Sequence, residues 1–397
     1  MPIVTVVGTG GSIISIKIDS ASNAVIAQNL LNVLSAEIRG DTITPFDYGG
    51  LGPLHPPPGL NDAIITGEGV VSVPSTTRDV IDIAPGPVLL FGGTAPEQLV
   101  VAASPLIYFA NTGTGTVIAS GGGSEIVELH GGAHLFLTDS GNNRILALDG
   151  SDTIGAGTGH NTIVLGSGRD VVEVTGHDSI LAGSGDAIVD VLSGNALVQG
   201  GTGKLVFINA GGDSTVLGGD GSTTLSGGSG GGVYAGGADG HNLLTTGLQA
   251  STLFGAGTDD LLLALGGGND LLVAGHGSET LLGAGSGADT FVGGHGKDVI
   301  TGGFGDNTFV AGHGSETLTG GFAGNSYVFA NHHADGSFVI TDFLPGADVV
   351  VLHGYSAGDL NDALAHQTHH GGDTTIKLGD ATITFQDISH LSKSWFT

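Results

Sequence analysis

The stretch GGHGKDVITGGFGDNTFV, Gly293–Val310, holds two nine-residue phrases that follow one another without a gap. Each phrase opens on a glycine-rich turn and reaches one large apolar residue, Ile300 or Phe309, with a β-branched residue on either side. Glycine permits the positive φ angles that tight turns need, and one apolar residue between outward-facing neighbours is a minimal β-strand. The stretch therefore predicts a repeating unit of one short strand and one turn.

The same nine-residue spacing of apolar residues extends through most of the chain, with one step of eight, one step of ten and a disturbance near residues 243–271. The positions are Phe109, Ile118, Val127, Phe136, Ile145, Ile154, Ile163, Val172, Ile180, Val189, Val198, Phe207, Val216, Leu225, Tyr234, Leu243, Leu272, Leu281, Phe291, Ile300, Phe309, Leu318 and Tyr327. A unit with a single apolar side chain cannot bury it alone, so the units must stack. We therefore expect an all-β fold, a parallel β-roll or β-solenoid in which two units form each coil of about 18 residues.

Four nonapeptides match a known pattern, and three of them are consecutive. Gly293–Thr301 (GGHGKDVIT) satisfies every fixed position of G-G-x-G-x-D-x-U-x, in which U is apolar. Gly302–Val310 departs only at Asn307, and Leu265–Val273 and Ala284–Val292 depart only at the first glycine. The chain therefore resembles the repeats-in-toxin (RTX) calcium-binding β-roll proteins, most closely over residues 255–330.

This resemblance implies calcium sites between turns that lie one coil apart. An earlier turn supplies the carbonyls of its second and fourth positions and its sixth-position acid, and the later turn supplies its first and third carbonyls and its acid. Oxygen ligands of these kinds suit Ca2+. The implied ligands, turn against turn, are Gly266, Gly268 and Asp270 with Ala284, Ser286 and Asp289; Gly275, Gly277 and Glu279 with Gly293, His295 and Asp298; Gly285, Gly287 and Asp289 with Gly302, Phe304 and Asn307; and Gly294, Gly296 and Asp298 with Ala311, His313 and Glu316.

Some sixth positions depart from the family pattern. Glu279 and Glu316 are one methylene longer than Asp, and Asn307 is neutral, so each is expected to weaken or reshape its site. A second block of candidate calcium ligands comprises Asp152 and Asp170, together with Asn161 and Asp178. The alternative interpretation of any of these residues is a plain turn former, because Asp and Asn favour tight turns.

Between the two blocks the sixth positions carry no carboxylate; they are Ala187, Ala196, Leu205, Ser214, Thr223, Gly232 and His241. We expect this central stretch to coil without calcium. His276, His295 and His313 occupy third positions about one coil apart and should form an exposed column. A pH-sensing or transition-metal role for the imidazoles, and a role for their backbone carbonyls alone, are both open.

Composition and charge favour a cation as the bound species. The chain has 397 residues, with 76 Gly, no Cys, nine Lys plus Arg and 38 Asp plus Glu, for a formal net charge of −29. This charge argues against nucleic acid and anionic membranes as partners, because phosphate groups would be repelled. No apolar run reaches the roughly 18 residues of a membrane span, so we expect no membrane insertion. Without cysteine, disulfides and thiolate metal sites are excluded.

The two ends leave the nine-residue rhythm. Residues 1–85 predict a small α/β cap or assembly domain, with a helix over residues 20–39 that ends at Gly40 and bears one apolar stripe of Ala27, Leu30, Leu31, Leu34 and Ile38. Residues 86–254 predict a degenerate solenoid and residues 255–330 the calcium-binding roll. Residues 331–397 predict a β-rich cap that resembles the uncleaved signal region of type I-secreted proteins, and the first residues lack the features of a cleaved leader.

We therefore predict a secreted calcium-binding structural protein on the surface of a Gram-negative bacterium. It would self-assemble with copies of itself into a filament, surface layer or matrix. An adhesin or carbohydrate-binding module that contacts cell-surface polysaccharide is the alternative, followed by ice binding and a polysaccharide-acting enzyme. We expect no enzyme, because residues 1–85 are too few for the catalytic domain of RTX-tailed proteases and lipases. The G-x-S-x-G match at residues 227–231 also lacks the strand–turn–helix context.

Overall fold

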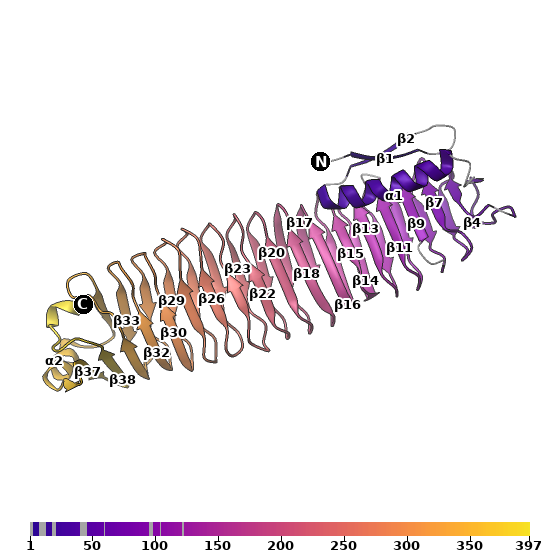
Figure 1. Ribbon diagram of the computed structural model, residues 1–397. Coiled ribbons are helices and arrows are strands. Elements are labelled where there is room, and N and C mark those ends of the chain that lie inside the picture. Colours follow the sequence, from indigo (N-terminus) through magenta and orange to yellow (C-terminus); the bar gives the residue numbers. More distant parts are fainter. Residues whose placement is uncertain are drawn as a thin grey trace. The chain divides into compact units, whose positions relative to one another are not determined.

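The computed structural model describes residues 3–7, 13–17, 21–39, 46–58, 60–94, 98–103, 105–120 and 123–397. Two compact units divide the chain, Met1–Lys204 and Leu205–Thr397. Each unit is built mostly of short strands that pair in parallel (Figure 1).

In the described part of the first unit, α1 (Ala21–Arg39) accompanies an antiparallel hairpin of β1 (Ile3–Val7) and β2 (Ile13–Lys17). Later strands alternate between two parallel sheets. The helix-covered sheet holds β3 (Phe46–Tyr48), β5 (Ala63–Ile65), β7 (Asp79–Asp82), β9 (Gln98–Ala102), β11 (Gly115–Ala119), β13 (His134–Thr138), β15 (Thr153–Ala156), the second half of β16 (Thr162–Val174) and β18 (Asp186–Val191). The open sheet holds β4 (Gly52–Pro53), β6 (Gly69–Ser72), β8 (Val88–Phe91), β10 (Leu106–Phe109), β12 (Ile126–Leu129), β14 (Arg144–Gly150), the first half of β16, β17 (His177–Leu181) and β19 (Asn195–Gln199).

The second unit repeats this alternation. Its even sheet holds β20 (Leu205–Asn209), β22 (Thr223–Ser226), β24 (Leu243–Thr245), β26 (Leu261–Ala264), β28 (Thr280–Gly283), β30 (Lys297–Thr301), β32 (Ser315–Thr319), β34 (Ser337–Ile340) and β38 (Ala381–Phe385). Its odd sheet holds β21 (Ser214–Leu217), β23 (Gly232–Ala235), β25 (Ser251–Phe254), β27 (Leu271–Val273), β29 (Thr290–Val292), β31 (Thr308–Val310), β33 (Ser326–Ala330) and β35 (Val349–His353). The remaining elements are α2 (Ala357–Ala365), β36 (Thr368–His370), β37 (Asp373–Leu378) and a 3-10 turn at Lys393–Trp395.

The expected parallel β-solenoid is confirmed by the strand register. In the odd sheet Phe291 pairs with Phe309 and Phe309 with Tyr327, a separation of one coil at each step. Their rings stack with centroids 5.4 and 5.1 Å apart inside the coil and are almost completely buried. Two nine-residue strand–turn units per coil thus bring one apolar side chain from each strand into a narrow core.

Three apolar positions of the predicted register are displaced by one residue. Tyr108, not Phe109, pairs with Val127, and Val117, not Ile118, pairs with Phe136. Leu244, not Leu243, pairs with Leu225, and the coils continue through the stretch that the sequence left disturbed. The reason is turn length, since ten residues instead of nine separate Tyr234 from Leu244. His241 is therefore not a sixth-position residue; that place belongs to the buried Asn242.

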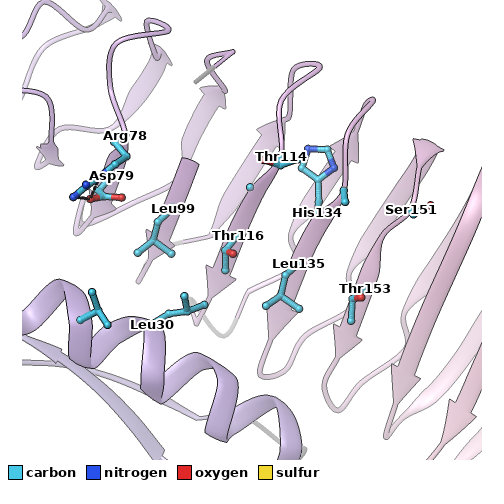
Figure 2. Close-up of a pocket in the computed structure, with 13 residues that line it drawn as sticks. Leu30, Arg78, Asp79, Leu99, Thr114, Thr116, His134, Leu135, Ser151 and Thr153 are labelled. Carbon is cyan, nitrogen blue, oxygen red and sulfur yellow. Dashed lines mark hydrogen bonds and ion pairs between the residues drawn. The ribbon is translucent and has the colours of Figure 1, made fainter. Parts of the chain in front are cut away.

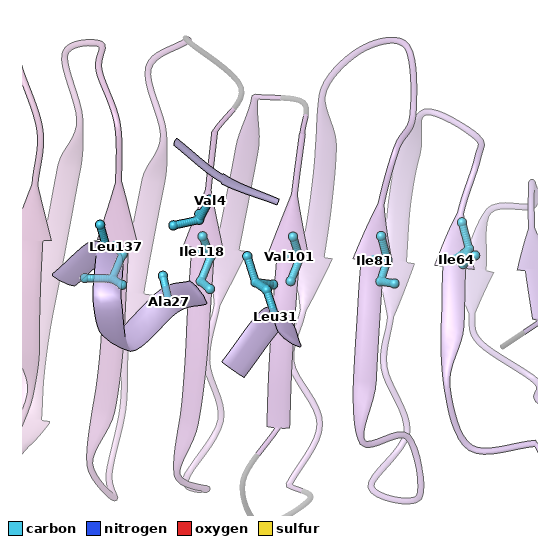
Figure 3. Packing of buried hydrophobic residues seen from close by; sticks show 9 residues of the cluster. Val4, Ala27, Leu31, Ile64, Ile81, Val101, Ile118 and Leu137 are labelled. Atoms are coloured by element: carbon cyan, nitrogen blue, oxygen red, sulfur yellow. The ribbon is translucent and has the colours of Figure 1, made fainter. Parts of the chain in front are cut away.

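The helix predicted over residues 20–39 is confirmed as α1, and it covers the outer face of one sheet. Ala27 and Leu31 are fully buried against a row of outward-facing residues that includes Ile118 (Figure 3). Ile118 is thus buried, but beneath the helix rather than inside the coil. The other row residues are Ile64, Ile81, Val101 and Leu137, with Val4 of β1 packed beside them. The side chains of Leu34 and Ile38, and the predicted stop at Gly40, lie outside the described residues.

The parallel coils begin earlier than the boundary expected at residue 86, because β3 already pairs in parallel with β5 from Phe46 onward. At the other end β38 pairs in parallel with β34 and antiparallel with β37. A capping box of Ser356 and Asp359 opens α2. Among the described residues, no helix combines the length and apolarity that a membrane crossing requires.

Candidate metal centres at the turn edges

Each coil has two turns, and the sixth-position residue of each turn lies two residues before the buried apolar residue of the next strand. Because strands alternate between sheets, the sixth positions of the second unit separate into two rows. The row that precedes the even sheet holds Asn242, Asp260, Glu279, Asp298 and Glu316. The row that precedes the odd sheet holds Ser251, Asp270, Asp289, Asn307, Asn325 and Asp348. The structure thus places both acids of each predicted pair of turns in one row.

Short side chains in these rows form a hydrogen-bond ladder along the solenoid. The Asp289 Oδ1 accepts the backbone N–H of Asp270 at 2.9 Å, and the Asp298 Oδ1 accepts that of Glu279 at 3.0 Å. Asn307 accepts the N–H of Asp289 in the same way, at 2.9 Å. An amide oxygen therefore replaces a carboxylate oxygen in this bond, and the ladder itself needs no cation.

Asn307 nevertheless alters its turn. Its amide nitrogen donates to the carbonyl of Gly302 at 2.9 Å and to that of Gly305 at 2.8 Å. The Gly302 carbonyl is one of the oxygens that the resemblance assigns to calcium. A neutral side chain that already engages this oxygen makes the site between Asp289 and Asn307 the poorest fit of the four.

Glu279 and Glu316 behave differently from their Asp neighbours. Oε1 of Glu279 accepts the N–H of Gly277 at 2.8 Å and Oε1 of Glu316 accepts that of Gly312 at 2.6 Å, each within its own turn. Asp298 also accepts an N–H of its own turn, from Gly294 at 2.8 Å, but its other oxygen accepts the N–H of Glu279 in the preceding coil. The Oε2 atoms of the two glutamates are buried and find no hydrogen-bond partner among the described residues. The two residues are only 1% and 2% exposed.

Burial raises the pKa of both glutamates to about 8. Asp298, which lies between them in the row, adds to the effect through its negative charge. An unpaired buried carboxylate oxygen is costly, and a hard cation that shared it with neighbouring carbonyls would remove the cost. These oxygens are where the residues present fit calcium best. Bound calcium would supply positive charge between carboxylates that otherwise repel one another.

Glycines of adjacent turns approach so closely that no side chain fits between them. A Cβ on the later glycine of each of four stacked pairs would collide with the carbonyl of the earlier one; the pairs are Gly266–Gly285, Gly268–Gly287, Gly275–Gly294 and Gly277–Gly296. A Cβ on Gly293 would likewise occupy the space of the Glu316 carboxylate. The predicted second-position carbonyls also take part in the backbone ladder, as when Gly275 accepts the N–H of His295 at 3.1 Å. A carbonyl oxygen has two lone pairs, so one remains for a cation.

The first unit contains the second candidate block. Asp152 Oδ1 accepts both the backbone N–H and the ring Nδ1 of His134, at 2.8 and 3.0 Å, and its Oδ2 is buried without a hydrogen-bond partner among the described residues. The Asp152 N–H donates to Asp170 at 2.9 Å. Burial, followed by the charge of Asp152, raises the pKa of Asp170 to about 6. Asp152 and Asp170 therefore lie together, and one orphaned oxygen is again available.

Three acidic sixth positions were not among the predicted ligands. Asp260 lies in the stretch where the register was disturbed, and Asp348 lies within the predicted C-terminal cap. Both accept a backbone N–H from the preceding coil, Asn242 to Asp260 at 2.8 Å and Asn325 to Asp348 at 2.7 Å. Glu125 lies in the first unit, two residues before the buried Val127. One sequence pattern identifies all three: an acidic residue two positions before an inward-facing apolar residue.

The predicted histidine column is present. The rings of His276, His295 and His313 stack with centroids 5.1 and 4.9 Å apart, and His313 Nδ1 lies 3.1 Å from Asp335 Oδ1. In the described part of the chain, no group of three or more His, Asp or Glu side chains is arranged to hold a metal ion. A cation at the turn edges must therefore take backbone carbonyls as well as carboxylates.

The first unit also has a groove of about 700 Å3 between α1 and the helix-covered sheet (Figure 2). Leu30, Leu99 and Leu135 form its apolar walls, and Arg78 is paired with Asp79 at 2.9 Å on its rim. His134 also lines it, but the imidazole is held against Asp152 and is almost completely buried. Burial raises the pKa of Asp79 to about 6, despite the adjacent Arg78.

Comparison with known proteins supports the calcium interpretation. The profile of the RTX calcium-binding nonapeptide repeat (four copies) matches residues 137–172, 283–318 and 292–326. These segments include Asp152 and Asp170 in the first unit and Asp289, Asp298 and Glu316 in the second. These segments therefore match RTX nonapeptide repeats, which bind Ca2+ and occur in proteins that are typically secreted.

Among solved structures, the extracellular lipase LipA from Serratia marcescens matches with 18% identity, over 67% of this chain and 44% of the lipase. The chain thus spans less than half of the lipase. The TM-score is 0.20, so the two chains do not superpose as whole structures, and no activity follows from the likeness. A search of curated proteins finds no match.

Proposed function

We propose that this is a calcium-dependent structural protein that is exported to the surface of a Gram-negative bacterium and assembles there with its own copies into a filament, layer or matrix. Calcium would bind first at the even-sheet row of the second unit, between the turns of Glu279, Asp298 and Glu316. These turns combine orphaned buried oxygens with consecutive carboxylates. Neutralising them would stabilise the folded unit.

The observation that supports assembly is the distribution of charge in the second unit. Strands β21, β23, β25, β27, β29, β31 and β33, all of which the structure describes, contain no Asp, Glu, Lys, Arg or His. Their outward positions are Thr, Val, Leu, Ser, Ala and Phe, as in the flanking pairs Thr290/Val292 and Thr308/Val310. Copies with a net charge of −29 repel one another through their acidic turns, so a charge-free sheet face is where they can meet.

We further propose that the chain is not an enzyme. Its most enzyme-like arrangement is the His134–Asp152 pair beside the groove of the first unit, and both side chains are buried against each other. The imidazole of His134 is hydrogen-bonded to Asp152, so it is not available to the groove as a free base. Hydrolysis of a chromogenic ester that His134→Gln abolishes would contradict this part of the proposal.

Negative-stain electron microscopy of the purified full-length protein, in millimolar calcium and in excess chelator, tests the assembly. We expect ordered filaments or sheets with calcium and dispersed particles without it. Val292→Lys with Val310→Lys should prevent assembly by placing charge on the odd sheet. Ser229→Lys with Thr258→Lys adds the same charge at exposed turns of the second unit and should not. Dispersed particles under both conditions, or assembly that ignores the odd-sheet change, would reject self-assembly through this face.

A further inference from the structure

The second unit has a hollow at the turns where the odd-sheet row of sixth positions loses its Asp and Asn residues. There the sixth positions are Ser214, Gly232 and Ser251, on three successive coils. The hollow measures about 560 Å3 and extends over a fourth coil to Asn269 and Leu271. Its first coils lie in the central stretch for which the sequence predicts no calcium, and its fourth coil adjoins Asp270, a predicted calcium ligand.

Core packing fixes glycine at two positions that line this hollow. Tyr234 points into the coil, and its hydroxyl donates to the Gly231 carbonyl at 3.1 Å and accepts from Asn209 Nδ2 at 3.3 Å. A Cβ on Gly232 would collide with the Tyr234 ring, and a Cβ on Gly231 would press against the carbonyl of Ala250. Glycine is therefore required at both places, and backbone rather than side chains forms this part of the lining.

The polar groups around the hollow suit a neutral ligand with many hydroxyls. Gln249 and Asn269 are exposed, and each amide offers donors and an acceptor. Asp213, whose carboxylate accepts the N–H of Gly231 at 2.9 Å, also lines the hollow. Thr215 and Thr252 add hydroxyls from the adjoining strands. The lining thus mixes donors and acceptors with only one formal charge.

An apolar surface continues from the hollow along the same strands. Val233 lies between Thr215 and Thr252 in the strand register and lines the hollow. Two residues beyond Thr252, on the same side of the sheet, Phe254 is 38% exposed. Ligand sites generally combine an apolar surface that the ligand packs on with a few polar groups that fix its orientation. Here the exposed aromatic ring is the apolar surface, and the nearby amides and hydroxyls are the polar groups.

We propose that this hollow binds a segment of a neutral polysaccharide. The C–H face of a sugar ring would lie on Phe254 and Val233, and its hydroxyls would bond with Gln249, Asn269 and Asp213. An anionic glycan would be repelled by the net charge of −29. An extended peptide has no place as an added strand, because β21, β23, β25 and β27 already pair with one another in parallel. This binding does not depend on self-assembly.

Affinity electrophoresis of the full-length protein in calcium tests the site, with native gels that contain dextran, laminarin, galactomannan or alginate. We expect retardation by at least one of the three neutral polymers and none by alginate. Gln249→Ala with Phe254→Ala should weaken the association constant by about tenfold or more, as expected for a lost polar and a lost apolar contact. Gln199→Ala, an exposed amide on β19 in the first unit, is the matched control and should bind as the unmodified protein does.

Both altered side chains face solvent, so the double variant should unfold at the same temperature as the unmodified protein. No retardation in any neutral gel, retardation by alginate alone, or equal retardation of the double variant would each overturn the proposal. Loss of binding with the thermal transition unchanged would support it. Electron microscopy reports assembly separately, so failure of one proposal does not imply failure of the other.

Discussion

At the scale of single residues, one methylene decides what the sixth position does. Asp298 accepts the N–H of Glu279 in the preceding coil with one oxygen and that of Gly294 in its own turn with the other. Glu316 accepts the N–H of Gly312 in its own turn, and its Oε2 is buried without a hydrogen-bond partner among the described residues. Asn307 continues the ladder by accepting the N–H of Asp289, but its amide nitrogen donates to the Gly302 carbonyl of its own turn. These three side chains are nearly the same size but differ in their contacts. Asp298 links two coils, Glu316 keeps one oxygen without a partner in the described part of the chain, and Asn307 hydrogen-bonds to carbonyls of its own turn.

Replacing Glu279 and Glu316 together by Gln should remove much of the stabilisation that calcium gives the second unit. Thermal unfolding with and without calcium measures it, and we expect the calcium-induced rise in the melting temperature to fall by at least half. Without calcium the double variant should be the more stable protein, because it buries no unpaired charge. Asn307→Asp should act in the opposite sense, increasing the calcium effect. An unchanged calcium response in all variants would show that these turns do not bind the ion.

Glu125 predicts a pH dependence that is independent of the proposed calcium turns. Burial raises its pKa from 4.5 to about 7, and its Oε1 is buried without a hydrogen-bond partner among the described residues. A carboxyl group whose pKa is raised on folding stabilises the fold below its unfolded pKa, and that contribution is lost as the pH rises through the folded value. The first unit should therefore lose about 1–3 kcal/mol of stability between pH 4.5 and pH 8 through this group.

Glu125→Gln should abolish that loss, and urea unfolding at both pH values measures it. Glu128→Gln, on the outward side of the same strand, should leave the slope unchanged. Equal pH slopes for the unmodified protein and Glu125→Gln would contradict the assignment.

At the scale of elements, each coil places its inward side chains over those of the next coil, so the core is a set of stacks. Phe291, Phe309 and Tyr327 form one such stack in the odd sheet. Neighbouring coils are held in register by backbone hydrogen bonds, so a gap in the stack has little room to collapse. α1 adds a second layer only in the first unit, where Ala27 and Leu31 pack on the outer face of a sheet.

Phe309→Ala should destabilise the second unit by about 3–5 kcal/mol, and Phe309→Leu by about 1 kcal/mol, because the first leaves a cavity and the second largely fills it. Denaturant unfolding in calcium measures both. Phe304→Ala is the matched control. That ring stacks on Phe322 at a turn but is 64% exposed, so its removal should cost less than about 0.5 kcal/mol. Similar losses for Phe304 and Phe309 would contradict the inward assignment of the stack.

At the scale of the whole molecule, the acids are concentrated at turns, while the odd sheet of the second unit is uncharged. In the proposed assembly, calcium would neutralise the acidic turns, and the uncharged face of the odd sheet would stay available to copies of the chain. The distribution of acids also divides the second unit into two parts, because β20–β23 come before the turns whose sixth positions are mostly acidic. The sixth positions of that part carry no carboxylate, so its coils depend on backbone pairing and apolar stacking.

Calcium removal should therefore loosen the second unit unevenly. Hydrogen exchange with mass spectrometry, in calcium and in chelator, should show a large loss of protection over β26–β32 and a smaller one over β20–β23. The reason is that only the former lie beside the carboxylate row of Asp260, Glu279, Asp298 and Glu316. The exchange of β20–β23 in unmodified protein is the internal control. Uniform loss across the unit would contradict calcium binding at this row.

Much of the molecule follows from local sequence. The solenoid, the two-strand coil, the helix over residues 20–39 and the candidate calcium turns were all predicted, because each depends on residues a few positions apart. The one-residue displacements at Tyr108, Val117 and Leu244 were not, since a ten-residue unit and a nine-residue unit look alike when neighbouring residues are all apolar. Predicted domain boundaries and the identity of the occupied turns stay predictions.

By itself, then, the sequence determined the coil, because a single apolar residue every nine positions can be buried only by stacking. Tertiary structure decided which sixth-position residues share a row, where Glu279 and Glu316 point, and which oxygens are left without partners. It also decided that Ile118 lies beneath α1 and that Gly231 and Gly232 line a hollow of the second unit. These outcomes depend on what the next coil places opposite each residue, at a distance of about 18 positions, and local pattern does not contain that information.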